Sequence, residues 1–221
     1  MGRREYGNVI GNLGKTYINK LSQATGDLCN ARIETSNKRI DLMKLIRRIT
    51  DSDIFGGTPE LIESVSRYAS RGVLIDEEMN AAMMYMSEIN LYKLPGGGIE
   101  EKETIDQSFL REIREETGYE AKVFHELGYI EEHKKKNDFM QLSYCWIAYA
   151  RRRVSAVKLS ESEKQLGMVV NWMTLDRAME LMNESLINCN DYSTKFMILR
   201  DKTILNIAYE ILKRNESEHF K

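Results

Sequence analysis

The chain is poor in cysteine. Its 221 residues include three, Cys29, Cys145 and Cys189, which are odd in number, far apart and without metal-ligand spacing. A disulfide framework and a cysteine-ligated zinc site are therefore not expected. We expect reduced thiols, as in a cytoplasmic protein.

Long apolar runs are also missing. No segment approaches the length of a membrane span, and the first residues, MGRREYGN, contain no apolar core for a signal peptide. Tyr6 stands where a myristoylation signal requires Ser or Thr. We therefore expect a cytoplasmic location and no membrane partner.

The chain has no large excess of charge of either sign. It carries 32 basic and 34 acidic residues, which give a net charge of −2 and argue against nucleic acid as a partner. The basic run Arg151–Arg153 is interpreted as a solvated strand end. The hydrophobic content of 42% and charged content of 30% are typical of a globular protein. The length allows one sizeable domain with an extension, or two small domains.

What the chain does have is a carboxylate-rich segment. Glu112, Glu115 and Glu116 are spaced by three and four residues, which places them on one face of an α-helix. They precede Gly118, a helix-stop signal, so they would lie at the negative end of the helix dipole. A bound cation would relieve the repulsion, and Mg²⁺ or Mn²⁺ suits carboxylates without nearby Cys or His.

The three glutamates alone fit a solvated helix face equally well, and the wider spacing decides between the two interpretations. The segment matches G-x5-E-x7-R-E-U-x-E-E-x-G-U, where U is bulky and apolar. The matching residues are Gly97, Glu103, Arg111, Glu112, Ile113, Glu115, Glu116, Gly118 and Tyr119. A chance match is rare even in a Glu-rich segment. This pattern is the Nudix box, and the chain resembles a Nudix hydrolase without substitution at any fixed position.

The resemblance implies an α/β fold: an α/β/α sandwich in which a mixed β-sheet lies between the box helix and later helices. It also implies hydrolysis of a nucleoside diphosphate linked to another moiety, with one to three Mg²⁺ or Mn²⁺ ions at the box helix. We expect residues 43–221 to form this domain. Residues 1–42 would form a helical extension, which is too short for its own core and is expected to pack at a homodimer interface.

The resemblance also implies metal-ligating roles for four residues. Glu112 and Glu116 are the first candidates, Glu115 is the next, and the backbone carbonyl of Gly97 can join them. A glycine at that position lets the backbone approach an ion closely.

Further roles follow for the residues around these ligands. Arg111 is interpreted as an orienting residue that ion-pairs with box glutamates such as Glu103, and Glu103 as an organiser of the loop–helix junction. The general base stays open. It can be a box glutamate such as Glu112 or Glu115, or an acid of the loop KLSESEKQLGM, either Glu161 or Glu163. A solvated loop acid is the simpler interpretation of both Glu161 and Glu163.

Two other functions remain open beside the pyrophosphohydrolase. One is a catalytically idle Nudix module that binds a nucleotide or a protein partner. The other is an RNA 5′-end pyrophosphohydrolase, for which the basic segments 134–136 and 151–153 give some support. No residue pattern identifies the second moiety of the substrate.

The pattern of apolar residues predicts strands and helices in irregular order, as in a mixed α/β domain. Residues 42–54 fit a helix or a strand equally well. The other expected elements are a hairpin of strands 72–75 and 81–86, a strand at 91–94, a loop at 95–98, a helix at 104–117, strands at 119–129 and 140–150 joined by a polar loop, a strand at 169–173, and helices at 175–182 and 193–213.

Overall fold

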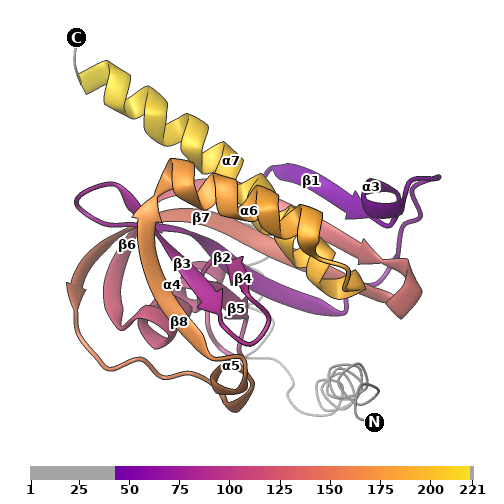
Figure 1. Ribbon diagram of the computed structural model, residues 1–221, viewed down its shortest axis with the longest axis horizontal. Helices are drawn as coiled ribbons and strands as arrows, with labels where there is room; N and C mark the ends of the chain where they lie inside the picture. Colours follow the sequence, from indigo (N-terminus) through magenta and orange to yellow (C-terminus); the bar gives the residue numbers. More distant parts are fainter. Residues whose placement is uncertain (1–42, 220–221) are drawn as a thin grey trace, which may run out of the picture. The chain divides into compact units, whose positions relative to one another are not determined.

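The structure is a computed structural model that describes residues 43–219, with side chains as far as Arg214. The helical extension predicted for residues 1–42 lies outside the described residues. The elements are β1 (Leu45–Thr50), α3 (Ser52–Phe55), β2 (Arg67–Ile75), β3 (Asn80–Met86), β4 (Leu91–Lys93), β5 (Gly96–Gly98), α4 (Ile105–Thr117), β6 (Tyr119–Lys134), the 3-10 turn η1 (Lys135–Asn137), β7 (Phe139–Arg153), α5 (Glu161–Gln165), β8 (Met168–Thr174), α6 (Leu175–Asn188) and α7 (Tyr192–His219) (Figure 1).

The strands form one mixed sheet. Its main path is β1-β6-β7-β2-β3-β4, and β5 and β8 pair with β2 and β3 respectively. β1 runs parallel to β6 and β2 runs parallel to β7, whereas the other pairs are antiparallel. The predicted mixed sheet is therefore confirmed.

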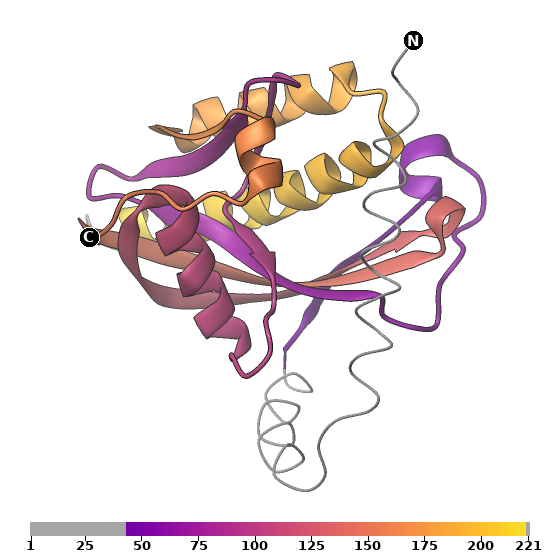
Figure 2. The same ribbon diagram turned by 90° about the horizontal axis from the view of Figure 1, so that it is seen from below.

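Helices cover both faces of this sheet. Figure 2 shows α4 on one face and α6 with α7 on the other. Because side chains alternate along a strand, β2 serves both layers. Ser70 donates a hydrogen bond to the Ile105 carbonyl of α4 at 2.6 Å, whereas Val73 packs in the core that contains Phe196 and Leu205 of α7. This is the predicted α/β/α sandwich.

Local signals determine both ends of α4. The Thr104 side chain accepts the Gln107 N–H and the Gln107 side chain accepts the Thr104 N–H, which is a capping box. At the other end Gly118 adopts a left-handed conformation with φ 78°. Ile105, Phe109 and Ile113 are buried, as predicted. The predicted helix is thus confirmed to within one residue.

The polar segment 131–138 is where the prediction of the elements was wrong. It was expected to be a hairpin loop, but β6 continues to Lys134 and only the 3-10 turn Lys135–Asn137 separates it from β7. Glu131, Glu132, His133 and Lys134 are all buried. Their charges are neutralised in part within the fold, for example by Lys134 Nζ at 3.5 Å from Glu132 Oε1. Polarity alone therefore misplaced the strand end.

The secondary structure of three shorter segments could also be assigned only from the tertiary structure. Residues 45–50 form a strand, which was one of the two interpretations, and a one-turn helix follows at Ser52–Phe55. Gly96–Gly98, expected in a loop, pairs with Ala69–Arg71 of β2. Glu161–Gln165 forms a short helix inside the predicted loop.

The two described cysteines, Cys145 and Cys189, are free and buried. Burial raises the pKa of the Cys145 thiol to about 12, so it stays protonated at neutral pH. No helix in the described part of the chain is long and apolar enough to cross a membrane.

Candidate active site

The box carboxylates lie against the glycine strand β5. A Cβ placed on Gly97 would be 2.3 Å from Glu112 Oε1, so a larger residue there would displace this carboxylate from the strand. One residue earlier, the Gly96 N–H donates to Glu116 Oε2 at 2.8 Å. The structure therefore brings together Gly97, Glu112 and Glu116, three of the four predicted metal ligands.

Burial raises the proton affinity of two of these carboxylates. Glu116 is 1% exposed, and burial raises its pKa to about 7, although Lys93 Nζ lies 2.6 Å from its Oε1 and opposes the shift. Burial also raises the pKa of Glu112, against the effect of Arg111. Two neighbouring carboxylates that are costly to ionise favour a nearby divalent cation.

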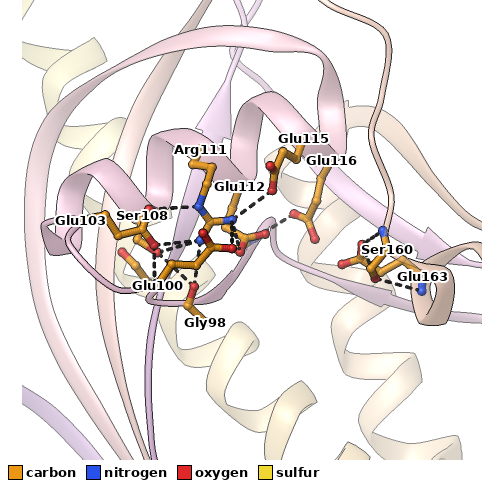
Figure 3. A network of polar contacts seen from close by, with 12 residues as sticks. Gly98, Glu100, Glu103, Ser108, Arg111, Glu112, Glu115, Glu116, Ser160 and Glu163 are labelled. Carbon is orange, nitrogen blue, oxygen red and sulfur yellow. Dashed lines mark hydrogen bonds and ion pairs between the residues drawn. The ribbon is translucent and has the colours of Figure 1, made fainter. Parts of the chain in front are cut away.

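Arg111 holds the other box glutamates. Its Nε and Nη2 donate to the two oxygens of Glu103 at 3.0 and 2.9 Å. Its Nη1 donates to Glu112 Oε1 at 2.9 Å and to Glu115 Oε2 at 3.0 Å. Nη2 also reaches the Gly98 carbonyl at 2.9 Å, so the guanidinium ties α4 to β5 (Figure 3). These contacts are those expected of an orienting residue.

Glu115 and Glu163 differ in how free their carboxylates are. The Glu115 side chain is 40% exposed and forms an ion pair with Arg111. Glu163 accepts the N–H and the hydroxyl of Ser160, both at 2.8 Å, and so caps α5. Figure 3 shows this cap apart from the Arg111 network. The structure thus brings Glu115 to the box cluster and leaves Glu163 in a separate structural contact.

The structure adds two residues that the sequence did not single out. Lys93, on β4, pairs with Glu116. Asp201, on α7, accepts the Leu94 N–H at 2.9 Å and so anchors the chain two residues before β5. Lys93 directly precedes the Leu-Pro-Gly-Gly lead-in, and Arg200-Asp201 is a charged pair inside an apolar helix stretch. The sequence shows both features, but the partners of Lys93 and Asp201 could be identified only from the tertiary contacts.

The residues present fit a hard divalent cation. Carboxylates and backbone carbonyls are the oxygen donors that Mg²⁺ and Mn²⁺ take, and Glu112 and Glu116 already touch the β5 backbone. Within residues 43–219 no three Asp, Glu, His or Cys side chains already form a metal-holding group. Arg111 pairs with Glu112, and Lys93 pairs with Glu116.

The mixed-sheet α/β/α sandwich and the carboxylate-rich helix against a glycine strand are the features expected from the Nudix box. Comparison with known families agrees: the model of the NUDIX domain matches residues 67–188, more than half of the chain, and the chain belongs to the NUDIX family. The predicted family is therefore confirmed.

Solved structures of this family are also similar to the chain. A NUDIX hydrolase from Nitrosomonas europaea is 19% identical, with 53% of this chain and 78% of that one covered and a TM-score of 0.44. A NUDIX hydrolase from Listeria monocytogenes is 16% identical, with 67% and 95% covered and a TM-score of 0.45. No curated protein matches the chain.

Proposed function

We propose that the protein is a metal-dependent pyrophosphohydrolase that cleaves the diphosphate linkage of a nucleoside diphosphate joined to another moiety. Membership of the NUDIX family supports hydrolysis of nucleoside diphosphate derivatives. The observation that carries the proposal is the contact of Glu112 and Glu116 with the backbone of Gly96 and Gly97. It places two carboxylates that favour a cation beside the backbone of the glycine strand.

In this proposal Glu112, Glu115, Glu116 and the Gly97 carbonyl hold one to three Mg²⁺ or Mn²⁺ ions. When bound, such ions neutralise the oxygens of a diphosphate and acidify a coordinated water. The protein supplies the arrangement of the ligands, because Arg111 fixes Glu112 and Glu115 relative to the Gly98 carbonyl.

We assign proton acceptance from the attacking water to Glu115. It is the most exposed of the box carboxylates in the Arg111 network. Glu163 would have to give up its hydrogen bonds with Ser160, and with them the cap of α5, before it could act. Glu103 and Arg111 serve to orient the ligands rather than to transfer a proton.

The structure weakens the case for an RNA substrate. Of the basic residues that favoured it, Lys134 is buried beside Glu132, Lys135 pairs with Glu60 at 3.8 Å, and Lys136 lies over the Tyr192 ring. Arg151–Arg153 is exposed, as predicted for a solvated strand end. Three lysines already engaged in internal contacts do not make a free phosphate-binding surface.

Hydrolysis should require a divalent metal and should increase as the pH is raised from about 6 to about 8. A proton on Glu116, whose pKa is about 7, competes with the ion, so the apparent metal affinity should rise through neutral pH. The measurement is a screen of nucleoside diphosphate derivatives with Mg²⁺ or Mn²⁺, in which a phosphatase releases phosphate from the products. Equal turnover in excess chelator would show that the metal has no part in the reaction.

We also propose a cytoplasmic homodimer, in which residues 1–42 contribute to the contact between subunits. The free thiols of Cys145 and Cys189 are consistent with a reducing compartment. Removing residues 1–40 should weaken self-association and leave the metal site intact. Sedimentation of the full-length and truncated chains tests this, and an unchanged oligomeric state, solubility and melting temperature would contradict it.

A further inference from the structure

A group of charged side chains lies on the α7 face of the sheet. Arg200 of α7 binds Asp201 Oδ1 through Nε at 2.7 Å and Glu132 Oε2 through Nη1 at 3.0 Å. Lys134 lies 3.5 Å from Glu132. Arg67 and Arg71 of β2 interact electrostatically with Arg200 and Glu132 of this group. The group thus holds four cations, Arg67, Arg71, Lys134 and Arg200, and two carboxylates, Glu132 and Asp201.

Arg71 has a buried guanidinium nitrogen that is not satisfied within the described residues. It is 4% exposed, and its Nε has no hydrogen-bond partner within the described residues. None of the ion pairs seen between residues 43 and 214 involves Arg71. Burial and the Arg200 charge lower the pKa of Arg71 to about 10, so it remains a cation at neutral pH. A buried guanidinium nitrogen without a hydrogen-bond acceptor is unfavourable, and the planar fork of the group suits a phosphate.

The position of Arg71 connects this group to the candidate metal site. A Cβ on Gly96 would lie 2.4 Å from the Arg71 Cβ, and one on Gly98 would lie 3.2 Å from Arg67 Nη2. The Gly97 Cβ would point to Glu112 instead. Successive residues of a strand face opposite sides, so the two arginines and the box carboxylate lie on the two sides of one strand. Arg67 also interacts electrostatically with Glu112.

We infer that Arg71, together with Arg67, forms a phosphate-binding subsite that holds one phosphoryl group of the diphosphate substrate beside the metal site. This inference rests on the proposed pyrophosphohydrolase function. Arg67 is exposed and Arg71 is buried, so the phosphate enters past Arg67 and completes the hydrogen bonding of Arg71. The two excess positive charges of the group balance the charge of the phosphate. Arg71 is a binding residue in this scheme and takes no part in proton transfer.

Binding of inorganic pyrophosphate in excess EDTA tests the subsite without any turnover. Pyrophosphate should raise the melting temperature of the wild-type chain saturably, and Arg71→Met should weaken its apparent affinity about tenfold or more. Arg177→Met is the matched control, because Arg177 is an exposed cation of α6 paired with Glu180 at 2.9 Å. It should bind pyrophosphate as the wild type does. Acetate at the same ionic strength should give no comparable shift.

The outcomes separate the subsite from the proposed reaction. Arg71-dependent binding without turnover of any diphosphate would support the subsite and reject the hydrolase function. Turnover with the same KM in wild type and Arg71→Met would overturn the subsite and leave the hydrolase in place. Should Arg71→Met not fold, Arg71→Lys keeps the charge but loses the fork, and it should raise KM more than it lowers kcat. Wild-type pyrophosphate affinity and KM in Arg71→Lys would also overturn the subsite.

Discussion

Glu112→Gln and Glu116→Gln should each lower kcat by at least about a hundredfold while the chain stays folded. Each change removes one negative charge that the proposed ions require. It keeps the shape of the side chain, and a glutamine oxygen can still accept the Gly96 N–H that now donates to Glu116 at 2.8 Å. The measurement is steady-state hydrolysis of a substrate from the screen, with Mg²⁺ titrated for each variant. Glu101→Gln, an exposed carboxylate of the turn before α4, is the control and should keep wild-type activity.

The stability of Glu116→Gln provides a second measurement on the same variant. Burial raises the pKa of Glu116 to about 7 from an ordinary value of 4.5, so ionisation of Glu116 destabilises the metal-free fold as pH rises through this range. Glu116→Gln has no carboxylate to ionise and does not lose stability in this way. Its melting temperature in EDTA should therefore depend less on pH than that of the wild type. At neutral pH in EDTA the wild-type chain should therefore be the less stable of the two. Near wild-type rates with unaltered metal dependence in both variants would reject the assignment of the ligands.

Asp201→Ala should be strongly destabilising, by about 3–5 kcal/mol. The change leaves the buried Arg200 with Glu132 alone and leaves the Leu94 N–H without its acceptor at 2.9 Å. For a domain of this size the melting temperature should fall by about 10 °C. Thermal unfolding followed by circular dichroism measures this directly.

Glu210→Ala is the matched control for Asp201→Ala, because Glu210 is an exposed acid on the same helix. It should change stability by about 0.5 kcal/mol or less. Since Asp201 anchors the chain just before β5, the Asp201 variant should also lose activity at temperatures where it remains folded. If Asp201→Ala and Glu210→Ala had the same melting temperature, the contact between α7 and Leu94 would have no measurable role in the stability of the fold.

The box helix could be predicted because its signals are local. Thr104, Gln107 and Gly118 lie within fifteen positions of one another, and the fixed residues of the box from Arg111 to Gly118 occupy the same stretch. The position of Glu112 and Glu116 on one face follows from helix periodicity alone.

What could not be predicted depends on contacts between distant parts of the chain. Lys93 meets Glu116 at a separation of 23 residues, and Asp201 meets Leu94 at a separation of 107. The burial of Glu132 depends on Arg200, which is 68 residues away. In each case the residue type is typical of a surface, and only the tertiary partner explains its burial.

The three consecutive glycines of β5 have a consequence for conformational entropy. Glycine loses more backbone freedom on folding than any other residue, by about 0.5–1 kcal/mol relative to alanine in a regular element. A strand of three glycines therefore has little tendency to stay extended by itself. It is ordered by pairing with β2, by the Gly96 bond to Glu116 of α4, and by the Asp201 bond to Leu94 from α7. The order of this strand thus depends on helices from both faces of the sheet.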